Sequence, residues 1–392
     1  MNTNHSHPNY IPRLLNITST ILFNITAIIL LLCSLAAEVL TVSRRTSTGD
    51  TPQTYGMPYE EVTFPAREDG VEIAAWYIPV AEQVPARTPA IVLVHGWTAS
   101  RTVGFNQHFL DMAQELHQAG FAVMMIDLRG HGESEAAHVS FGVYERRDVL
   151  AAIDELLQRG HPAGRIGLLG TSMGAASVVG AAVEHPAVGA VVTDSLFADI
   201  QPVIEGQWSQ TSGMPLFLLD TTLGIFEGIN GYELTASRPV EEIALVAPRP
   251  LLMIHCQADS HIPLEQFESL KAAAPWAETW LVEECKHADI YEYAAEEYSE
   301  KVVGFFEEGL AMEEVAGGEA AAAGSRGSGH GSPAGCDPFR RLEVARTLRS
   351  PPAWTGQRSP LQGAWCVWPG GLPPGRQDAT LPLQQLALPP PA

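Results

Sequence analysis

The sequence predicts an α/β fold in which a mostly parallel, doubly wound sheet is covered by helices on both faces. Short apolar runs rich in β-branched residues alternate with amphipathic helical stretches through the middle of the chain. These runs are apolar at nearly every position, which is typical of parallel strands buried on both faces. The 392 residues are 46% hydrophobic and 17% charged, which supplies enough apolar surface for a packed core.

The expected strands follow one another between residues 71 and 283, and helical stretches such as 105–120 and 145–160 separate most of them. They are VEIAAWYIPV (71–80), PAIVLVHG (89–96), FAVMMIDLRG (121–130), RIGLLG (165–170), VGAVVTDS (188–195), RPLLMIHC (249–256) and TWLVE (279–283). The interval 199–247 breaks this alternation, because it is too long for a simple crossover and carries many large apolar side chains. Loops of that kind are usually functional lids, so we expect a small helical cap here.

An apolar segment near the N-terminus, residues 21–40, has about the 20 residues that a helix needs to cross a bilayer. We expect an uncleaved membrane anchor over residues 1–42, followed by a polar tether over residues 43–56. The alternative is a signal peptide cut among the small residues 34–37. The side of the membrane stays open, because Arg44 and Arg45 on one side compete with Arg13 and the terminal amine on the other.

The two ends of the chain differ from the body that we expect over residues 57–313. Residues 314–392 are rich in Pro, Gly and Arg without a Lys and show no periodicity, so we expect a disordered low-complexity tail. The chain has 45 acidic and 23 basic residues, a formal charge of −22, and no basic stripe. Nucleic acid is therefore not an expected partner.

A serine follows one predicted strand in the sequence Gly170-Thr-Ser172-Met-Gly174. The motif alone is weak, but its place between a strand and a helix gives it weight, because a serine on such a strained turn needs small neighbours. The N-terminus of the next helix would also stabilise an oxyanion. From this segment alone, a tight turn with Ser172 as an inert helix N-cap remains an equal alternative.

A base and an acid for that serine follow two later strands. Asp259 comes after the run 249–256, and His287 comes after the run 279–283. The carboxyl ends of parallel strands share the edge where open sheets place their sites, so we expect the three side chains to meet there. Asp194, at the end of the run 188–195, is the alternative acid.

Two further motifs complete a pattern: His95-Gly96-Trp97 after one strand, and Asp127-Leu-Arg-Gly-His-Gly-Glu-Ser134 after another. Over residues 59–310 the sequence therefore resembles the α/β-hydrolase superfamily, in its branch of serine hydrolases and dipeptidyl-peptidase-like proteins. The resemblance implies Ser172 as nucleophile, His287 as general base and then acid, and Asp259 as the residue that orients the imidazole. It also implies an oxyanion hole from the backbone N–H groups of Trp97 and Met173.

The sequence departs from that family at His255-Cys256, where the pattern has His-Gly. Cys256 and Cys285 follow neighbouring strands, and we hypothesise that they form a disulfide if the domain faces an oxidising compartment. The alternative is two small buried apolar side chains. Five cysteines are too few for a disulfide scaffold in a chain this long.

These residues favour a membrane-tethered serine hydrolase that cleaves an ester through an acyl-enzyme, with thioester and amide substrates less favoured. A serine peptidase of the same fold is one alternative, and a non-catalytic, membrane-anchored interaction domain is another. Metal spacings and nucleotide-binding motifs are missing from the sequence, so no cofactor is expected. The expected partners are a small acyl substrate and the membrane.

Overall fold

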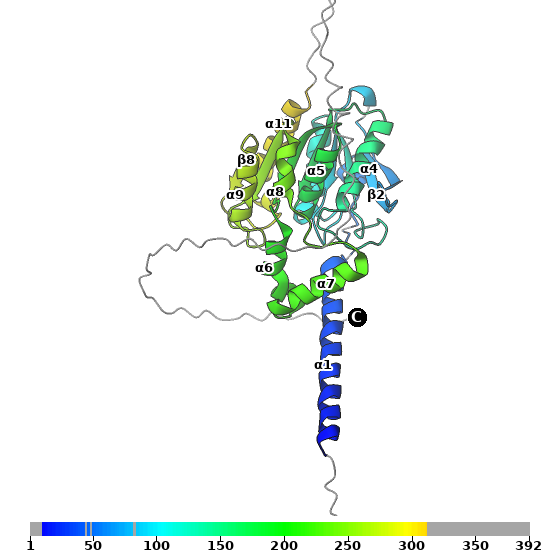
Figure 1. Cartoon of the computed structure of the whole chain (residues 1–392). Coiled ribbons are helices and arrows are strands. Elements are labelled where there is room, and N and C mark those ends of the chain that lie inside the picture. The colour runs from blue at the N-terminus through cyan, green and yellow to red at the C-terminus, as the bar shows by residue number, and fades with distance from the viewer. Residues whose placement is uncertain (1–9, 44, 48, 81–83, 312–392) are drawn as a thin grey trace, which may run out of the picture. The chain divides into compact units, whose positions relative to one another are not determined.

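The computed structural model describes residues 10–43, 45–47, 49–80 and 84–311, so the tail expected over residues 314–392 lies outside the described residues. The described body contains one eight-stranded sheet in the order β1-β2-β4-β3-β5-β6-β7-β8 (Figure 1). Its strands are β1 (Glu60–Pro65), β2 (Glu72–Ile78), β3 (Ala90–Val94), β4 (Ala122–Ile126), β5 (Ile166–Thr171), β6 (Val188–Asp194), β7 (Leu251–Cys256) and β8 (Glu278–Val282). The neighbouring strands in the part β4-β3-β5-β6-β7-β8 are all parallel to one another. Strand β2 is antiparallel to both of its neighbours, β1 and β4.

Helices cover both faces of this sheet, as the alternating pattern predicts. Side chains alternate between the two faces along each strand, so that Val92 and Val94 of β3 belong to one core while Ile91 and Leu93 belong to the other. Helices α4 (Glu145–Gln158) and α5 (Met173–Glu184) cover the first face, side by side in Figure 1. On the second face the helices are α2 (Gly104–Gln107), α3 (Phe109–Gln118), α10 (Ile290–Tyr293) and α11 (Ala295–Gly309).

Each strand expected from the sequence is present, but β1 was not expected. Its sequence, EEVTFP, is apolar at only two of its side chains, and only Phe64 is buried. An edge strand that pairs on one side needs no continuous apolar run. The sequence pattern of β1 is therefore too weak to identify it as a strand.

The interval 199–247 contains the helical cap that its length and apolar content indicate. Its elements are α6 (Ile200–Ser212), η3 (Leu216–Leu218), α7 (Leu219–Asn230), α8 (Pro239–Glu242) and η4 (Ile243–Val246). Asp199 begins α6 by accepting a hydrogen bond from the Gln201 amide at 2.9 Å. Trp208 is fully buried and its indole donates to the Pro215 carbonyl at 2.9 Å, which fixes the turn between α6 and α7.

The N-terminal helix α1 (Tyr10–Thr41) is long and apolar enough over Thr18–Thr41 to cross a bilayer, by length and composition. Most of its described side chains are exposed, but its last turns are buried against the cap helices α7 and α6 (Figure 1). The buried residues Cys33, Ala36 and Ala37 are small, which lets the helices approach closely. Thr41 ends the helix with two contacts to the body: its carbonyl accepts from the Val139 amide at 2.8 Å, and its hydroxyl lies 3.1 Å from His138 Nδ1.

The segment expected to be a polar tether lies against the body. Ser43 is buried, and the Thr46 hydroxyl donates to the Thr98 carbonyl at 3.3 Å. Further on, η1 (Pro52–Tyr55) is held by Gln114, whose amide donates to the Tyr55 carbonyl at 2.8 Å. The described residues between α1 and β1 therefore connect the helix to the body through specific contacts.

Candidate active site

The turn between β5 and α5 places Ser172 at the carboxyl edge of the sheet. Its backbone is left-handed, with φ 53° and ψ −117°, and its amide donates to the Asp194 carbonyl at 2.8 Å. A Cβ on Gly170 would lie 2.4 Å from the Gly174 carbonyl oxygen, and one on Gly174 would lie 2.3 Å from the Val94 carbonyl oxygen. Neither position has room for a Cβ atom. A larger residue at position 170 or 174 would therefore distort the strained turn that carries Ser172.

The three side chains expected from the sequence form one hydrogen-bonded chain. His287 Nε2 lies 2.9 Å from Ser172 Oγ, and His287 Nδ1 lies 2.7 Å from Asp259 Oδ2. Asp259 follows β7 and His287 follows β8, and these strands are parallel neighbours. An acid on Nδ1 leaves Nε2 free to accept the serine proton.

Hydrogen bonds keep the carboxylate of Asp259 ionised although it is buried. Its Oδ1 accepts from the amides of His261 at 2.8 Å and Ile262 at 2.9 Å. Burial alone would raise the pKa of Asp259, but the hydrogen bonds with His287 and the two amides outweigh burial and lower the pKa below its ordinary value. The ring of His261 also stacks on that of His287, with centroids 5.3 Å apart.

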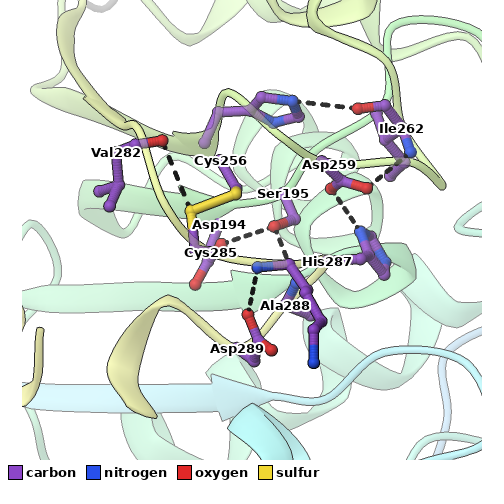
Figure 2. The surroundings of a disulfide bond; sticks show 12 residues. Asp194, Ser195, Cys256, Asp259, Ile262, Val282, Cys285, His287, Ala288 and Asp289 are labelled. Atoms are coloured by element: carbon purple, nitrogen blue, oxygen red, sulfur yellow. Dashed lines mark hydrogen bonds and ion pairs between the residues drawn. A yellow bond between two sulfur atoms is a disulfide. The ribbon is translucent and has the colours of Figure 1, made fainter. Parts of the chain in front are cut away.

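A disulfide joins the two loops that carry the acid and the base (Figure 2). Cys256 ends β7 and bonds to Cys285, with their Cα atoms 5.7 Å apart. The hypothesised bond is therefore present, and the side chain that departs from the family's His-Gly pattern is one of its two cysteines. Cys285 lies two positions before His287, so the bond fixes the start of the histidine loop next to the end of β7.

The histidine loop is held by further contacts that can be followed in Figure 2. The Lys286 amide donates to Asp289 Oδ1 at 2.7 Å, and the Ala288 amide donates to Ser195 Oγ at 3.2 Å. Ala288 is left-handed, with φ 57°, so the loop needs such contacts to keep its shape.

Asp194, the alternative acid, lies beneath this loop and does not hydrogen-bond to His287. It accepts from the Ser195 hydroxyl at 2.8 Å and from the Tyr298 hydroxyl at 3.2 Å. Burial raises the pKa of Asp194 to about 6, and the two hydrogen bonds only partly offset this effect. The imidazole of His287 is thus hydrogen-bonded to Asp259, whereas Asp194 is hydrogen-bonded to Ser195 and Tyr298.

The two backbone amides expected to form an oxyanion hole both border the site. Trp97 and Met173 line the cavity that Ser172 and His287 also line. Among the described residues, neither amide donates a hydrogen bond to another protein group. Met173 begins α5, so its amide lies at the positive end of the helix dipole.

Two cavities meet at Ser172 and differ in chemistry. One, of about 260 Å³, is mainly apolar and is lined by side chains of the cap and the body, among them Phe141, Met173, Phe197, Ile200, Val203 and Ile204. The other, of about 540 Å³, which we call the polar cavity, has a mixed lining in which polar side chains, among them Asn106, Lys286 and Glu292, lie beside apolar ones. Such a pair can hold an apolar group and a polar group on opposite sides of one scissile bond.

Sequence reasoning missed Ser195, Tyr298 and His261 as neighbours of the catalytic candidates. Ser195 directly follows Asp194, which could have drawn attention to it, but Tyr298 lies 104 positions away and carries no motif. In the described part of the chain, no group of three or more His, Cys, Asp or Glu side chains has the arrangement of a metal site.

Comparison with known proteins shows what the chain is similar to. Residues 86–224 match the family model described as serine aminopeptidase, S33. YfhR of Escherichia coli K12 is 30% identical over 253 residues, which cover 63% of this chain and 80% of YfhR. YqkD of Bacillus subtilis is 26% identical over 249 residues, which cover 61% of this chain and 76% of YqkD.

Solved structures share the fold at lower sequence identity. The esterase Pf2001 of Pyrococcus furiosus is 21% identical with a TM-score of 0.55, and the match covers 69% of this chain and all of the esterase. A puromycin-hydrolyzing peptidase of Mycobacterium tuberculosis is 18% identical with a TM-score of 0.53, and the match covers 66% of this chain and 40% of the peptidase. The chain belongs to the α/β-hydrolase superfamily and to the same protein family as YfhR.

Proposed function

We propose that the protein is a membrane-tethered serine hydrolase that cleaves a carboxylic ester through an acyl-enzyme. The observation that carries the proposal is the hydrogen-bonded chain from Ser172 through His287 to Asp259. A serine is a weak nucleophile unless a neighbouring base removes its proton, and a base is effective only when a third group orients it. The hydrogen bonds that His287 makes with Ser172 and with Asp259 support these three roles.

The reaction follows from the geometry. The ionised Asp259 accepts a hydrogen bond from the Nδ1–H of His287, so Nε2 is unprotonated and takes the Ser172 proton as Oγ attacks the carbonyl. The amides of Trp97 and Met173 stabilise the oxyanion that forms. His287 then gives its proton to the leaving alcohol, and water, activated by the same imidazole, releases the acid and restores the serine.

The last turns of α1 support a retained anchor over a cleaved signal peptide. Ala36, Ala37 and Leu40 are part of the hydrophobic core that includes the cap residues Trp208 and Phe226. Cleavage among residues 34–37 would expose apolar cap surface and leave Leu40 without its helix. We propose that α1 spans the membrane and stays attached.

An ester is preferred over a peptide because an alcohol leaves more easily than an amine and demands less of the general acid. The peptidase alternative is favoured by the family model, whose description is that of an aminopeptidase. Glu292, in the polar cavity, offers a carboxylate that a substrate ammonium group would require. Comparison of p-nitrophenyl esters with aminoacyl p-nitroanilides distinguishes the two substrates.

The proposal is tested by labelling the full chain with a fluorophosphonate, which reacts only with an activated serine. We expect the wild-type protein and the Ser269→Ala control to label, since Ser269 is exposed on α9 (Leu264–Ala273). The Ser172→Ala variant should not label, and its ester hydrolysis should fall by about 10⁴-fold or more. A wild-type protein that neither labels nor turns over any ester would favour the non-catalytic interaction domain.

A further inference from the structure

The apolar cavity beside Ser172 is formed in part by the N-terminal helix. Leu40, in the last turn of α1, is 4% exposed and lines the same cavity as Ser172 and His287. Val203 and Ile204 of α6 line the same cavity. A side chain of the proposed membrane helix therefore lies within the substrate site.

The contact between α1 and the cap lies at one end of the apolar segment. The candidate span Thr18–Thr41 has 24 residues, more than the about 20 that a bilayer requires, so its last turn can lie at the level of the headgroups. Cys33, Ala36 and Ala37 are buried against the cap, whereas Leu35 and Val39 on the other face of the helix are exposed. The cap thus meets α1 where the hydrocarbon region gives way to headgroups.

The cap also exposes large apolar side chains on α7, which contacts α1, and on η3, which contacts α7. Leu216 and Phe217 of η3 are 54% and 79% exposed, and Ile229 of α7 is 74% exposed. We call these three residues the cap patch. Figure 1 shows α7 beside α1, in agreement with their many contacts. Exposed apolar side chains next to a membrane helix are typical of a surface that enters the lipid interface.

The charge of the cap indicates what kind of lipid surface it would meet. Residues 199–247 contain seven acidic side chains and one basic side chain, Arg238, which is paired with Asp199 and Glu241. An electrostatic attraction to anionic headgroups is therefore missing, and contact with lipid would depend on apolar burial.

We propose that the substrate is an acyl ester lipid of the bilayer, whose chain reaches Ser172 between α1 and α6. The inference rests on the proposed function and names its substrate class. The apolar cavity receives the start of the acyl chain past Leu40, while the alcohol portion lies in the polar cavity with Lys286 and Asn106. The rest of the lipid stays in the bilayer, because 260 Å³ is below the volume of a typical pocket for a drug-sized ligand.

The chemical step is an ordinary acyl transfer. The bond from Ser172 Oγ to the acyl carbon forms and the ester C–O bond breaks, and the proton carried by His287 goes to the lipid alcohol. Water then attacks the acyl-enzyme, and a free fatty acid is released.

The first test uses the full chain in phosphatidylcholine vesicles and compares p-nitrophenyl palmitate, dissolved in the vesicles, with water-soluble p-nitrophenyl butyrate. Leu40→Trp should lower the palmitate-to-butyrate ratio of kcat/KM by about tenfold, because the larger ring occupies the path of the long chain. Leu35→Trp, on the exposed face of α1, is the matched control and should leave the ratio within about twofold.

Leu40 is closely packed, so its substitution could also disturb folding. A second variant therefore places a large side chain in the same cavity from a different helix. Val203→Trp, on α6, should change the ratio in the same direction. If both variants hydrolyse butyrate but keep the wild-type ratio, the lipid inference is wrong while the hydrolase proposal stands. If the wild-type chain hydrolyses neither ester and Ser172 does not label, both are wrong.

The second test concerns the source of the lipid. The double substitution Phe217→Ser and Ile229→Ser should lower palmitate hydrolysis in vesicles by about fivefold relative to butyrate hydrolysis, since the cap patch would no longer enter the interface. Leu245→Ser is the control, because Leu245 is 61% exposed on η4, which packs on α5, α8 and α9. Equal effects of the two changes would show that the ester arrives from solution and would overturn the inference.

Discussion

Cys256 and Cys285 are bonded to each other, and each cysteine closely precedes one of the two residues that we propose as the catalytic acid and base. Cys256 stands three positions before Asp259, and Cys285 stands two positions before His287. The distance of 2.7 Å between the acid and the imidazole therefore depends on two loops that a covalent bond holds together. Loops usually contribute the mobile parts of a site, and here the bond restricts them.

Removal of this bond should reduce both stability and activity. The disulfide closes a loop of 29 residues, so the double variant Cys256→Ser, Cys285→Ser should lose about 3 to 4 kcal/mol in the free energy of unfolding. Chemical denaturation measures this loss. A reductant should lower the melting temperature of the wild-type protein and leave that of the double variant unchanged. Equal sensitivity of both proteins to reductant would contradict a structural role of the bond.

The same bond predicts the side of the membrane on which the hydrolase body lies. Disulfides persist in oxidising compartments and are reduced in the cytosol. We therefore expect the body on the non-cytoplasmic side, with the N-terminus of α1 in the cytoplasm. An impermeant protease added to intact cells should degrade the body. Digestion that requires permeabilised cells would place it on the other side.

The titration of Asp194 should make the folded protein more stable at low pH than at high pH. This direction is opposite to that of acid denaturation. Its pKa is about 6 in the folded protein, above the value of about 4 in an unfolded chain. Between pH 4 and 6 the folded state therefore binds more protons at Asp194 than the unfolded state does. The contribution of Asp194 to the free energy of unfolding is complete below pH 4 and is lost as the pH rises through 6. Asp194→Asn should remove this dependence, which amounts to at most about 3 kcal/mol. Parallel wild-type and variant stability curves from pH 4 to 7 would contradict it.

Gly174 is expected to be intolerant of even one methyl group. A Cβ there would lie 2.3 Å from the Val94 carbonyl oxygen and 2.4 Å from that of His95, and neither backbone atom can move freely. Gly174→Ala should cost about 3 kcal/mol of unfolding free energy and slow fluorophosphonate labelling of Ser172. Gly206→Ala is the control: a Cβ on Gly206, inside α6, meets no atom within 4 Å. It should stabilise the protein by up to about 1 kcal/mol.

Much of the fold follows from local pattern. The buried parallel strands are apolar at nearly every position, so β3 to β7 are evident from single segments. The same reasoning brings Ser172, Asp259 and His287 to one edge, because each follows a strand and parallel strands end on the same side. Edge strand β1 carries only a weak pattern, and it was missed.

The parts of the site that the sequence did not predict depend on contacts between distant segments. Tyr298 reaches Asp194 only because α11 packs beneath β6. Leu40 belongs to an apolar segment whose composition indicates a membrane, and nothing in that composition indicates that one turn borders a cavity. Such contacts are set by how the cap and α1 pack, which a pattern within one segment does not encode.

The order of strands also sets when during synthesis the site is completed. The serine turn after β5 can form early, but the acid and the base follow the last two strands, and Tyr298 lies in the last described helix. A ribosome-bound chain that ends before residue 287 has the nucleophile without its base. The proposed base is therefore added long after the proposed anchor α1 has been synthesised, so on this proposal the nascent chain meets the bilayer before it can hydrolyse an ester.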